Sequence, residues 1–177
     1  MIVVDTSAWV EHIRGRSHPV AATLEALIQE RADLAITEAV LMEVLAGCSA
    51  ATMPRIRSRL LALPILRVEG LADYEEAARI YRACRDAGQT VRNQLDCLIA
   101  VPTIRHGASL LHNDRDFETI ARHTSLRLEP VEPLGPREGR DLREQPHLWK
   151  AGTARAAARR PRRARLAPAR RSRTAAR

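Results

Sequence analysis

Two carboxylates in this sequence follow short apolar runs. Asp5 comes directly after the β-branched run 2–4, and Asp114 comes directly after the run 108–113. Short apolar runs of this type predict strands that are buried on both faces. A carboxylate at the end of such a strand could bind a metal ion or take part in proton transfer.

Two further carboxylates lie on apolar faces of predicted helices. Glu43 has small apolar residues three and four positions away in both directions, and Asp96 has Ile99 and Ala100 one turn later. A charged side chain is rarely found on a face that packs into the core unless it is paired or bound to a metal. Arg92, four residues before Asp96, is a possible partner.

Gathering these four carboxylates in one place would cost considerable energy. Two like charges about 4 Å apart repel by roughly 4 kcal/mol at an effective dielectric constant near 20. Such a cluster must either take up protons or bind a cation. Oxygen ligands without His or Cys favour Mg²⁺ or Mn²⁺ over zinc, and Mg²⁺ often binds substrate phosphates as well. The chemistry predicted from the residues is therefore hydrolysis of a phosphodiester by a metal-activated water.

Each carboxylate also has a purely structural explanation. Asp5 and Asp114 could cap the helices that follow them, and Glu43 could face solvent. Asp96 could form an ion pair with the arginine four residues earlier. Asp116 is favoured as an acid of a first helical turn, stabilised by the helix dipole, over a direct metal ligand.

The elements that would position these residues alternate between strand and helix. Strands are predicted at residues 2–4, 34–36, 65–68, 108–113 and 126–130. Helices are predicted at residues 7–15, 18–32, 38–46, 56–63, 71–87, 93–107 and 115–122. Thr6 or Ser7 is the expected cap of the first helix. This alternation predicts an α/β fold with a mostly parallel central sheet flanked by helices, in which ligands bind beyond the carboxyl ends of the strands.

Charge is distributed unevenly along the chain. The net charge is +8, but residues 1–134 hold 15 Arg against 18 acidic residues, a net of −3. Residues 135–177 hold 13 Arg, one Lys and three acidic residues, a net of +11. We therefore predict one domain over residues 1–134, followed by a Pro/Gly-rich and then Arg/Ala-rich tail that is disordered. The tail could instead bind RNA phosphates, or be an extension past a lost stop codon.

The remaining features of the sequence indicate a cytoplasmic protein. Its three cysteines lack metal-ligand spacing and are expected to be small buried residues in a reducing compartment. No run of residues reaches the length needed to cross a bilayer, and no signal peptide is recognisable.

Four motifs, MIVVDTSAW, LMEVLAG, TVRNQLDCLIA and LLHNDRDFETIA, resemble those of the PIN-domain ribonucleases, specifically the VapC-type toxins of bacterial toxin–antitoxin pairs. The resemblance runs from Met1 to about Leu128, with the motifs in the family's order and spacing. It implies the PIN-like three-layer α/β fold. It also implies a Mg²⁺-dependent (or Mn²⁺-dependent) endoribonuclease that acts as the toxin of a type II toxin–antitoxin pair.

Carried over residue by residue, the resemblance makes Asp5 and Asp96 the principal metal ligands, with Glu43 as a ligand or general base. Asp114 would complete the catalytic and metal-binding set. A second layer of residues, which would orient the ligands without binding the metal ion directly, would consist of Thr6, Ser7 and Asp116. The resemblance further implies an RNA substrate, a small antitoxin of VapB type as partner, and a homodimer.

Pro102 departs from the family pattern. An interior proline costs ~3 kcal/mol and is expected to kink the helix that carries Asp96.

Three other functions compete with a toxin. A phosphotransfer domain would need a lysine near the phosphoryl group, and residues 1–134 contain none. A stand-alone PIN-like nuclease in RNA processing and a non-catalytic module that binds RNA or a partner remain as alternatives.

Overall fold

A computed structural model of the protein describes residues 1–15 and 17–131, which form a sheet flanked by helices. Within those residues, five strands form one sheet. They are β1 (Ile2–Val4), β2 (Leu34–Thr37), β3 (Ile65–Leu66), β4 (Ser109–Leu111) and β5 (Arg127–Leu128). All five predicted strands are present, although the third, fourth and fifth are shorter than predicted. The predicted tail and the boundary after residue 134 lie outside the described residues.

The sheet is parallel throughout the described part of the chain, with strand order β3-β2-β1-β4-β5. β1 therefore lies between β2 and β4, and Val4 is in register with Leu111. Side chains at the centre are fully buried on both faces: Val3 and Val4 are 0% exposed, as are Leu110 and Leu111. This confirms the prediction made from their apolar runs.

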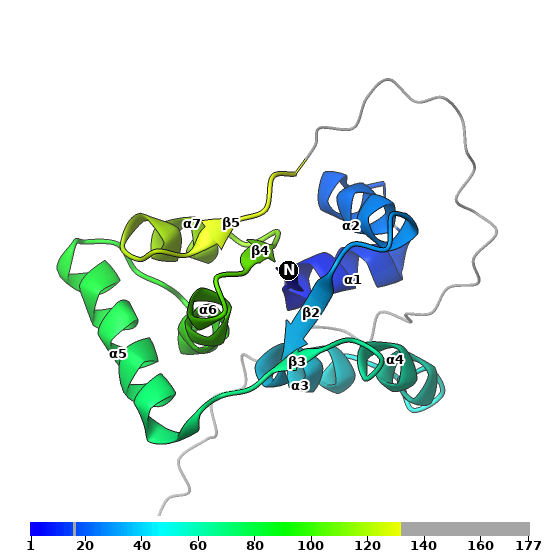
Figure 1. The fold of residues 1–177 in the computed structure, drawn as a ribbon, viewed down its shortest axis with the longest axis horizontal. Coiled ribbons are helices and arrows are strands. Elements are labelled where there is room, and N and C mark those ends of the chain that lie inside the picture. The colour runs from blue at the N-terminus through cyan, green and yellow to red at the C-terminus, as the bar shows by residue number, and fades with distance from the viewer. Residues whose placement is uncertain (16, 132–177) are drawn as a thin grey trace, which may run out of the picture.

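Seven helices connect the strands in the described residues. They are α1 (Thr6–Arg14), α2 (Pro19–Gln29), α3 (Glu38–Ala46), α4 (Met53–Leu60), α5 (Gly70–Asp86), α6 (Gln94–Arg105) and α7 (Arg115–Arg122). Figure 1 shows α1 to α4 on one side of the sheet and α5 to α7 on the other. This arrangement is the one that right-handed crossovers require for this strand order. The fold is thus a three-layer α/β fold, as predicted.

The helices that follow β1 and β4 lie on opposite sides of the sheet. From β1 it enters α1 on one side of the sheet, and from β4 it enters α7 on the other (Figure 1). The two strands are neighbours, so their carboxyl ends form a topological switch point. In open parallel sheets, ligands bind at such points.

Helix ends follow the sequence signals with one correction. Asp5, and not Thr6 or Ser7, is the N-cap of α1, because its side chain accepts a hydrogen bond from the Ser7 N–H. Gly15 ends α1 in a left-handed conformation with φ of 62°, where a side chain would be strained. Pro102 does not end α6, which continues as helix to Arg105.

Cysteines and membrane spans were further expectations from the sequence. Cys84 and Cys97 are buried in the core, while Cys48 is only partly buried. None of the described helices combines the length and apolar character needed to cross a bilayer.

Candidate active site

The ends of β1 and β4 bring two of the predicted carboxylates together. The Asp5 N–H donates to the Leu111 carbonyl at 2.9 Å, so Asp5 lies next to the last residue of β4. The Asn113 N–H donates to Ser7 Oγ at 2.8 Å and ties the loop before α7 to the start of α1. Asp114, the next residue, is therefore held beside Asp5, and its charge adds to the burial that raises the Asp5 pKa.

Asp5 and Asp114 are also helix caps, as the structural explanation predicted. Asp5 Oδ2 accepts from the N–H and the hydroxyl of Ser7, at 2.8 and 2.5 Å. Asp114 Oδ1 accepts from the Asp116 N–H at 3.0 Å. Each cap uses one carboxylate oxygen, so capping leaves the other oxygen for a further ligand.

Helices α3 and α6 supply the other two carboxylates. Glu43 is half-buried, and its Oε2 accepts a hydrogen bond from Thr6 Oγ1 at 2.6 Å. Asp96 lies in the first turn of α6, behind the N-cap Asn93, and is only 7% exposed. Within the described part of the chain no hydrogen-bond donor reaches the Asp96 carboxylate. A largely buried carboxylate without a protein donor is unusual, and its oxygens are available to bind a cation or a proton.

The electrostatics of Asp96 show that all the predicted acids gather around it. Burial, followed by the charges of Asp5, Asp114, Asp116 and Glu43, raises the pKa of Asp96 to about 8. Burial also raises the pKa of Asp5 and of Glu43, although hydrogen bonds from Ser7 and Thr6 oppose this. The structure therefore places all four predicted site residues in a single acidic cluster.

Asp116 is a fifth member of this cluster. Single carboxylate oxygens of Asp96, Asp114 and Asp116 all lie within 4.8 Å of one another. Asp116 is 5% exposed, so it is a buried acid as well as a residue of the first turn of α7.

Arg92 contacts this cluster from the loop before α6, but its partner is not Asp96. Its Nη2 donates to Asp114 Oδ1 at 2.5 Å, and its Nε lies 3.2 Å from both oxygens of Asp116. The possible Arg92–Asp96 ion pair is thus replaced by two other ion pairs. Asp96 forms no ion pair with any other described residue.

The donor set fits a hard divalent cation. Hydrogen bonds occupy Oδ2 of Asp5 and Oδ1 of Asp114, which leaves the opposite oxygen of each of these two carboxylates for a cation. The Glu43 carboxylate has hydrogen bonds from the side chains of Thr6 and Asn93. Asp96 has both oxygens available. Among the residues that the structure describes, five carboxylates in this cluster have ion pairs with one guanidinium, that of Arg92, and oxygen-only ligands of this charge suit Mg²⁺ or Mn²⁺.

Sequence reasoning missed two residues of the site. Arg92 was considered only as a possible partner of Asp96, and His112 was not singled out. His112 Nδ1 accepts from the Asp114 N–H at 3.2 Å, and its ring packs 5.4 Å from that of Phe117. In the sequence, His112 is marked only by its position two residues before Asp114, and this spacing alone does not indicate a role in the site.

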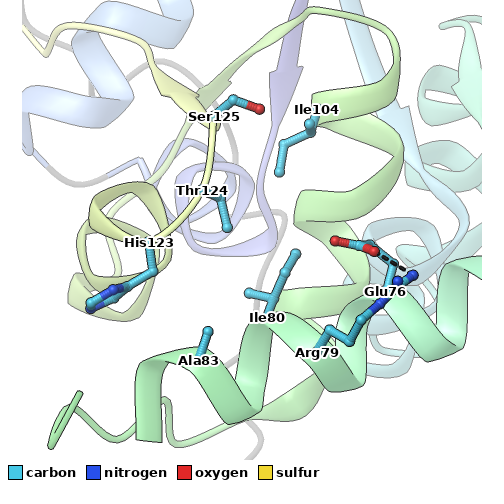
Figure 2. A pocket seen from close by; sticks show the side chains of 8 residues that line it. All are labelled: Glu76, Arg79, Ile80, Ala83, Ile104, His123, Thr124 and Ser125. Atoms are coloured by element: carbon cyan, nitrogen blue, oxygen red, sulfur yellow. Dashed lines mark ion pairs between the residues drawn. The ribbon is translucent and has the colours of Figure 1, made fainter. Parts of the chain in front are cut away.

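A groove elsewhere in the molecule has no part in this cluster. It measures about 250 Å³ and is lined by residues of α5, the end of α6 and the loop after α7 (Figure 2). Glu76 and Arg79, on its α5 wall, form an ion pair at 2.6 Å with each other. None of the five clustered carboxylates lines it.

Comparisons with known proteins agree with this geometry. Residues 2–123 match the model of the PIN domain family. The chain is 45% identical over 128 residues to ribonuclease VapC11 of Mycobacterium tuberculosis, covering 71% of this chain and 96% of that protein. The VapC ribonuclease Mb1587 of Mycobacterium bovis matches with the same figures.

Among solved structures, the VapBC2 complex of Rickettsia felis bound to a promoter DNA fragment contains a similar chain. The TM-score is 0.54 at 24% identity, over 73% of this chain and 98% of that one. At these levels of identity the likeness concerns the fold. Together with the sequence matches, it shows that the chain belongs to the PIN domain family, in its VapC group.

Proposed function

We propose that this protein is a Mg²⁺- or Mn²⁺-dependent endoribonuclease and the toxin of a type II toxin–antitoxin pair. The observation that carries the proposal is the convergence of Asp5, Glu43, Asp96 and Asp114 around a buried carboxylate that lacks a donor. The relatives support it, because those that match at 45% identity are named VapC ribonucleases.

In this proposal the four acids hold the metal ion and Thr6 and Ser7 orient two of them. Asp5 and Asp96 are the principal ligands, and Asp114 completes the set with the oxygen that Arg92 does not contact. A divalent ion bound there would lower the pKa of a water molecule and offset the charge of a phosphodiester.

Glu43 is the residue of this chain best suited to accept the proton of the attacking water. Burial raises its pKa above the ordinary carboxylate value, which brings it closer to neutral pH, where a general base is most effective. The Thr6 hydroxyl donates to Oε2 at 2.6 Å and the Asn93 side chain also hydrogen-bonds to Glu43, and these two contacts orient the carboxylate.

The partners belong to the same proposal. Solved neighbours of this fold include VapBC complexes, and we infer that this chain is likewise bound by a small antitoxin of VapB type. RNA is the substrate, and a homodimer remains a prediction from the family resemblance.

RNA cleavage by the purified full chain, freed of antitoxin, tests the proposal. We expect cleavage in Mg²⁺ or Mn²⁺, none in EDTA, and none with Asp96→Asn. The matched control is Asp33→Asn: Asp33 is 71% exposed and lies beside the N-terminal amino group, at the opposite end of β1 from Asp5. A folded protein that cleaves no RNA in Mn²⁺ would contradict the proposal.

Co-expression distinguishes a toxin from a stand-alone nuclease. If the chain is a toxin, a short neighbouring reading frame should encode a small protein that binds it and suppresses RNA cleavage. Growth arrest on expression of the chain alone, relieved by that protein, is the expected result.

A further inference from the structure

Arg92 is a permanent cation beside an acidic site that is proposed to bind a metal, and its side chain is 68% exposed. Its side chain reaches from the loop before α6 to α7, where it forms ion pairs with Asp114 and Asp116. Its backbone N–H donates to Asp116 Oδ2 at 2.7 Å as well. Arg92 is thus attached to Asp116 by main chain and side chain together.

The two acids that Arg92 contacts differ in how many of their carboxylate oxygens it occupies. Both oxygens of Asp116 are used by Arg92, and its side chain is 8% exposed. Asp114 contributes only Oδ1 to Arg92 and to the Asp116 N–H. Asp114 therefore keeps an oxygen for a metal ion, whereas Asp116 has none that is not already shared with a guanidinium.

The same contacts explain how the cluster can exist before a metal binds. Five carboxylates in one place repel one another strongly. The Arg92 guanidinium offsets part of this repulsion, because it forms ion pairs with Asp116 on α7 and with Asp114 at the N-cap of α7. Because an arginine is always charged and binds carboxylates through a planar fork, it is well suited to this role.

We propose that Arg92 is the built-in counter-ion of the acidic site, and that Asp116 serves to hold Arg92 and does not ligate the metal. The inference rests on the proposed metal site, since a counter-ion matters only if a cation is to bind beside it. Asp116 is then a positioning residue that acts through Arg92.

Binding of Mn²⁺ alone to the full-length protein tests the inference without using RNA. Melting temperatures are measured in EDTA and in saturating Mn²⁺, and the Kd for Mn²⁺ is measured by titration calorimetry. In Arg92→Gln we expect a lower Tm in EDTA and a Mn²⁺-induced rise in Tm that exceeds that of the wild type by about 2 to 4 °C. Mn²⁺ should bind about three- to tenfold more tightly, because a competing positive charge has been removed.

Two variants control for simple loss of an ion pair. Arg105→Gln removes an arginine that binds another buried acid, Asp73, away from the site. It should lower the Tm equally with and without Mn²⁺ and leave the Kd unchanged. Arg92→Lys keeps the charge and should keep a Kd close to that of the wild type.

Asp116→Asn tests the second half of the inference. It should weaken Mn²⁺ binding by about three- to tenfold, the effect of one charge, while Asp96→Asn abolishes it. Combining Asp116→Asn with Arg92→Gln restores the net charge and should return the Kd to near the wild-type value.

The inference is overturned if Arg92→Gln leaves the Mn²⁺-induced rise unchanged or reduces it, or if Asp116→Asn abolishes binding as Asp96→Asn does. A wild-type protein that shows no response to Mn²⁺ would instead overturn the metal site itself, and the inference with it. A wild type that binds Mn²⁺ but cleaves no RNA would overturn the proposed ribonuclease and leave the counter-ion standing.

Discussion

Thr6 Oγ1 lies 2.6 Å from Glu43 Oε2, and this hydrogen bond joins the first turn of α1 to α3 across the candidate site. The two residues are 37 positions apart in the chain. Burial raises the pKa of Glu43, and the Thr6 hydroxyl opposes that rise by donating to the charged form.

Thr6→Val removes this hydroxyl while keeping the shape of the side chain. We expect RNA cleavage to fall about 10- to 100-fold, the usual cost of losing a group that orients a metal-site residue. The kcat/KM on a short RNA in Mn²⁺ measures the effect. Thr6→Ser, which keeps the hydroxyl, should retain most of the activity; equal losses in the two variants would contradict a role for the hydrogen bond.

The metal-free protein should lose stability as the pH rises. The pKa of Asp96 is raised from 3.8 to about 8, so between these pH values the folded state binds more protons than the unfolded state. The free energy of unfolding then falls from about pH 4 to pH 8. The raised pKa values of Asp5 and Glu43 act in the same direction.

Asp96→Asn should reduce this pH dependence. The amide cannot ionise, so the variant is expected to be more stable than the wild type at pH 8 in EDTA, although inactive. Thermal unfolding in EDTA across this pH range is the measurement. A variant that is less stable than the wild type at pH 8 would show that the ionised Asp96 carboxylate does not destabilise the metal-free fold.

A second buried acid, Asp73, should behave in the opposite way. Arg105 Nη1 donates to both Asp73 oxygens at 2.6 and 2.5 Å, and the Glu69 N–H donates at 2.7 Å. Burial alone would raise the Asp73 pKa, but these partners hold it below its ordinary value. Its contribution is therefore present above the unfolded-state pKa and is lost as the pH falls through the lowered, folded-state pKa.

Asp73→Asn should destabilise the protein by about 2 kcal/mol at pH 7, because it weakens a charge-assisted pair that joins the start of α5 to the end of α6. Urea unfolding at pH 7 and at pH 3 checks both parts of the prediction. The difference between wild type and variant should shrink in acid, and an equal difference at both pH values would be inconsistent with it.

Strand ends made half of the site predictable. Asp5 and Asp114 follow apolar runs that form neighbouring parallel strands, and carboxyl ends of parallel strands meet at one edge of a sheet. Glu43 and Asp96 were identified because a charge on an apolar helix face requires a partner. Which oxygens remain free could not be predicted, since that depends on donors from Thr6 and other residues that are distant in sequence.

The possible Arg92–Asp96 ion pair is not formed, and the reason is geometric. Residues four apart face each other only inside a helix, and α6 begins at Gln94 with Asn93 as its cap. Arg92 therefore precedes the helix, and its side chain extends toward α7 and not along α6. The predicted helix start, residue 93, is one residue before the observed start, and Arg92 precedes both, so the four-residue spacing did not indicate an ion pair.

Pro102 provides the last prediction. It lies inside α6, buried, six residues after Asp96, and the helix continues to Arg105. A proline at an interior position costs ~3 kcal/mol through its missing N–H and its steric clash. Pro102→Ala removes that cost but also exchanges two buried methylenes, worth about 1.6 kcal/mol, for space.

We therefore expect Pro102→Ala to stabilise the protein by about 1 kcal/mol, as measured by urea unfolding in EDTA. RNA cleavage should not change, because Asp96 is held by the first turn of α6 and its cap Asn93. If the variant is less stable, the residues around α6 are fitted to the proline ring and the void left by alanine outweighs the backbone gain. If activity changes while stability does not, the second half of α6 affects how Asp96 is placed.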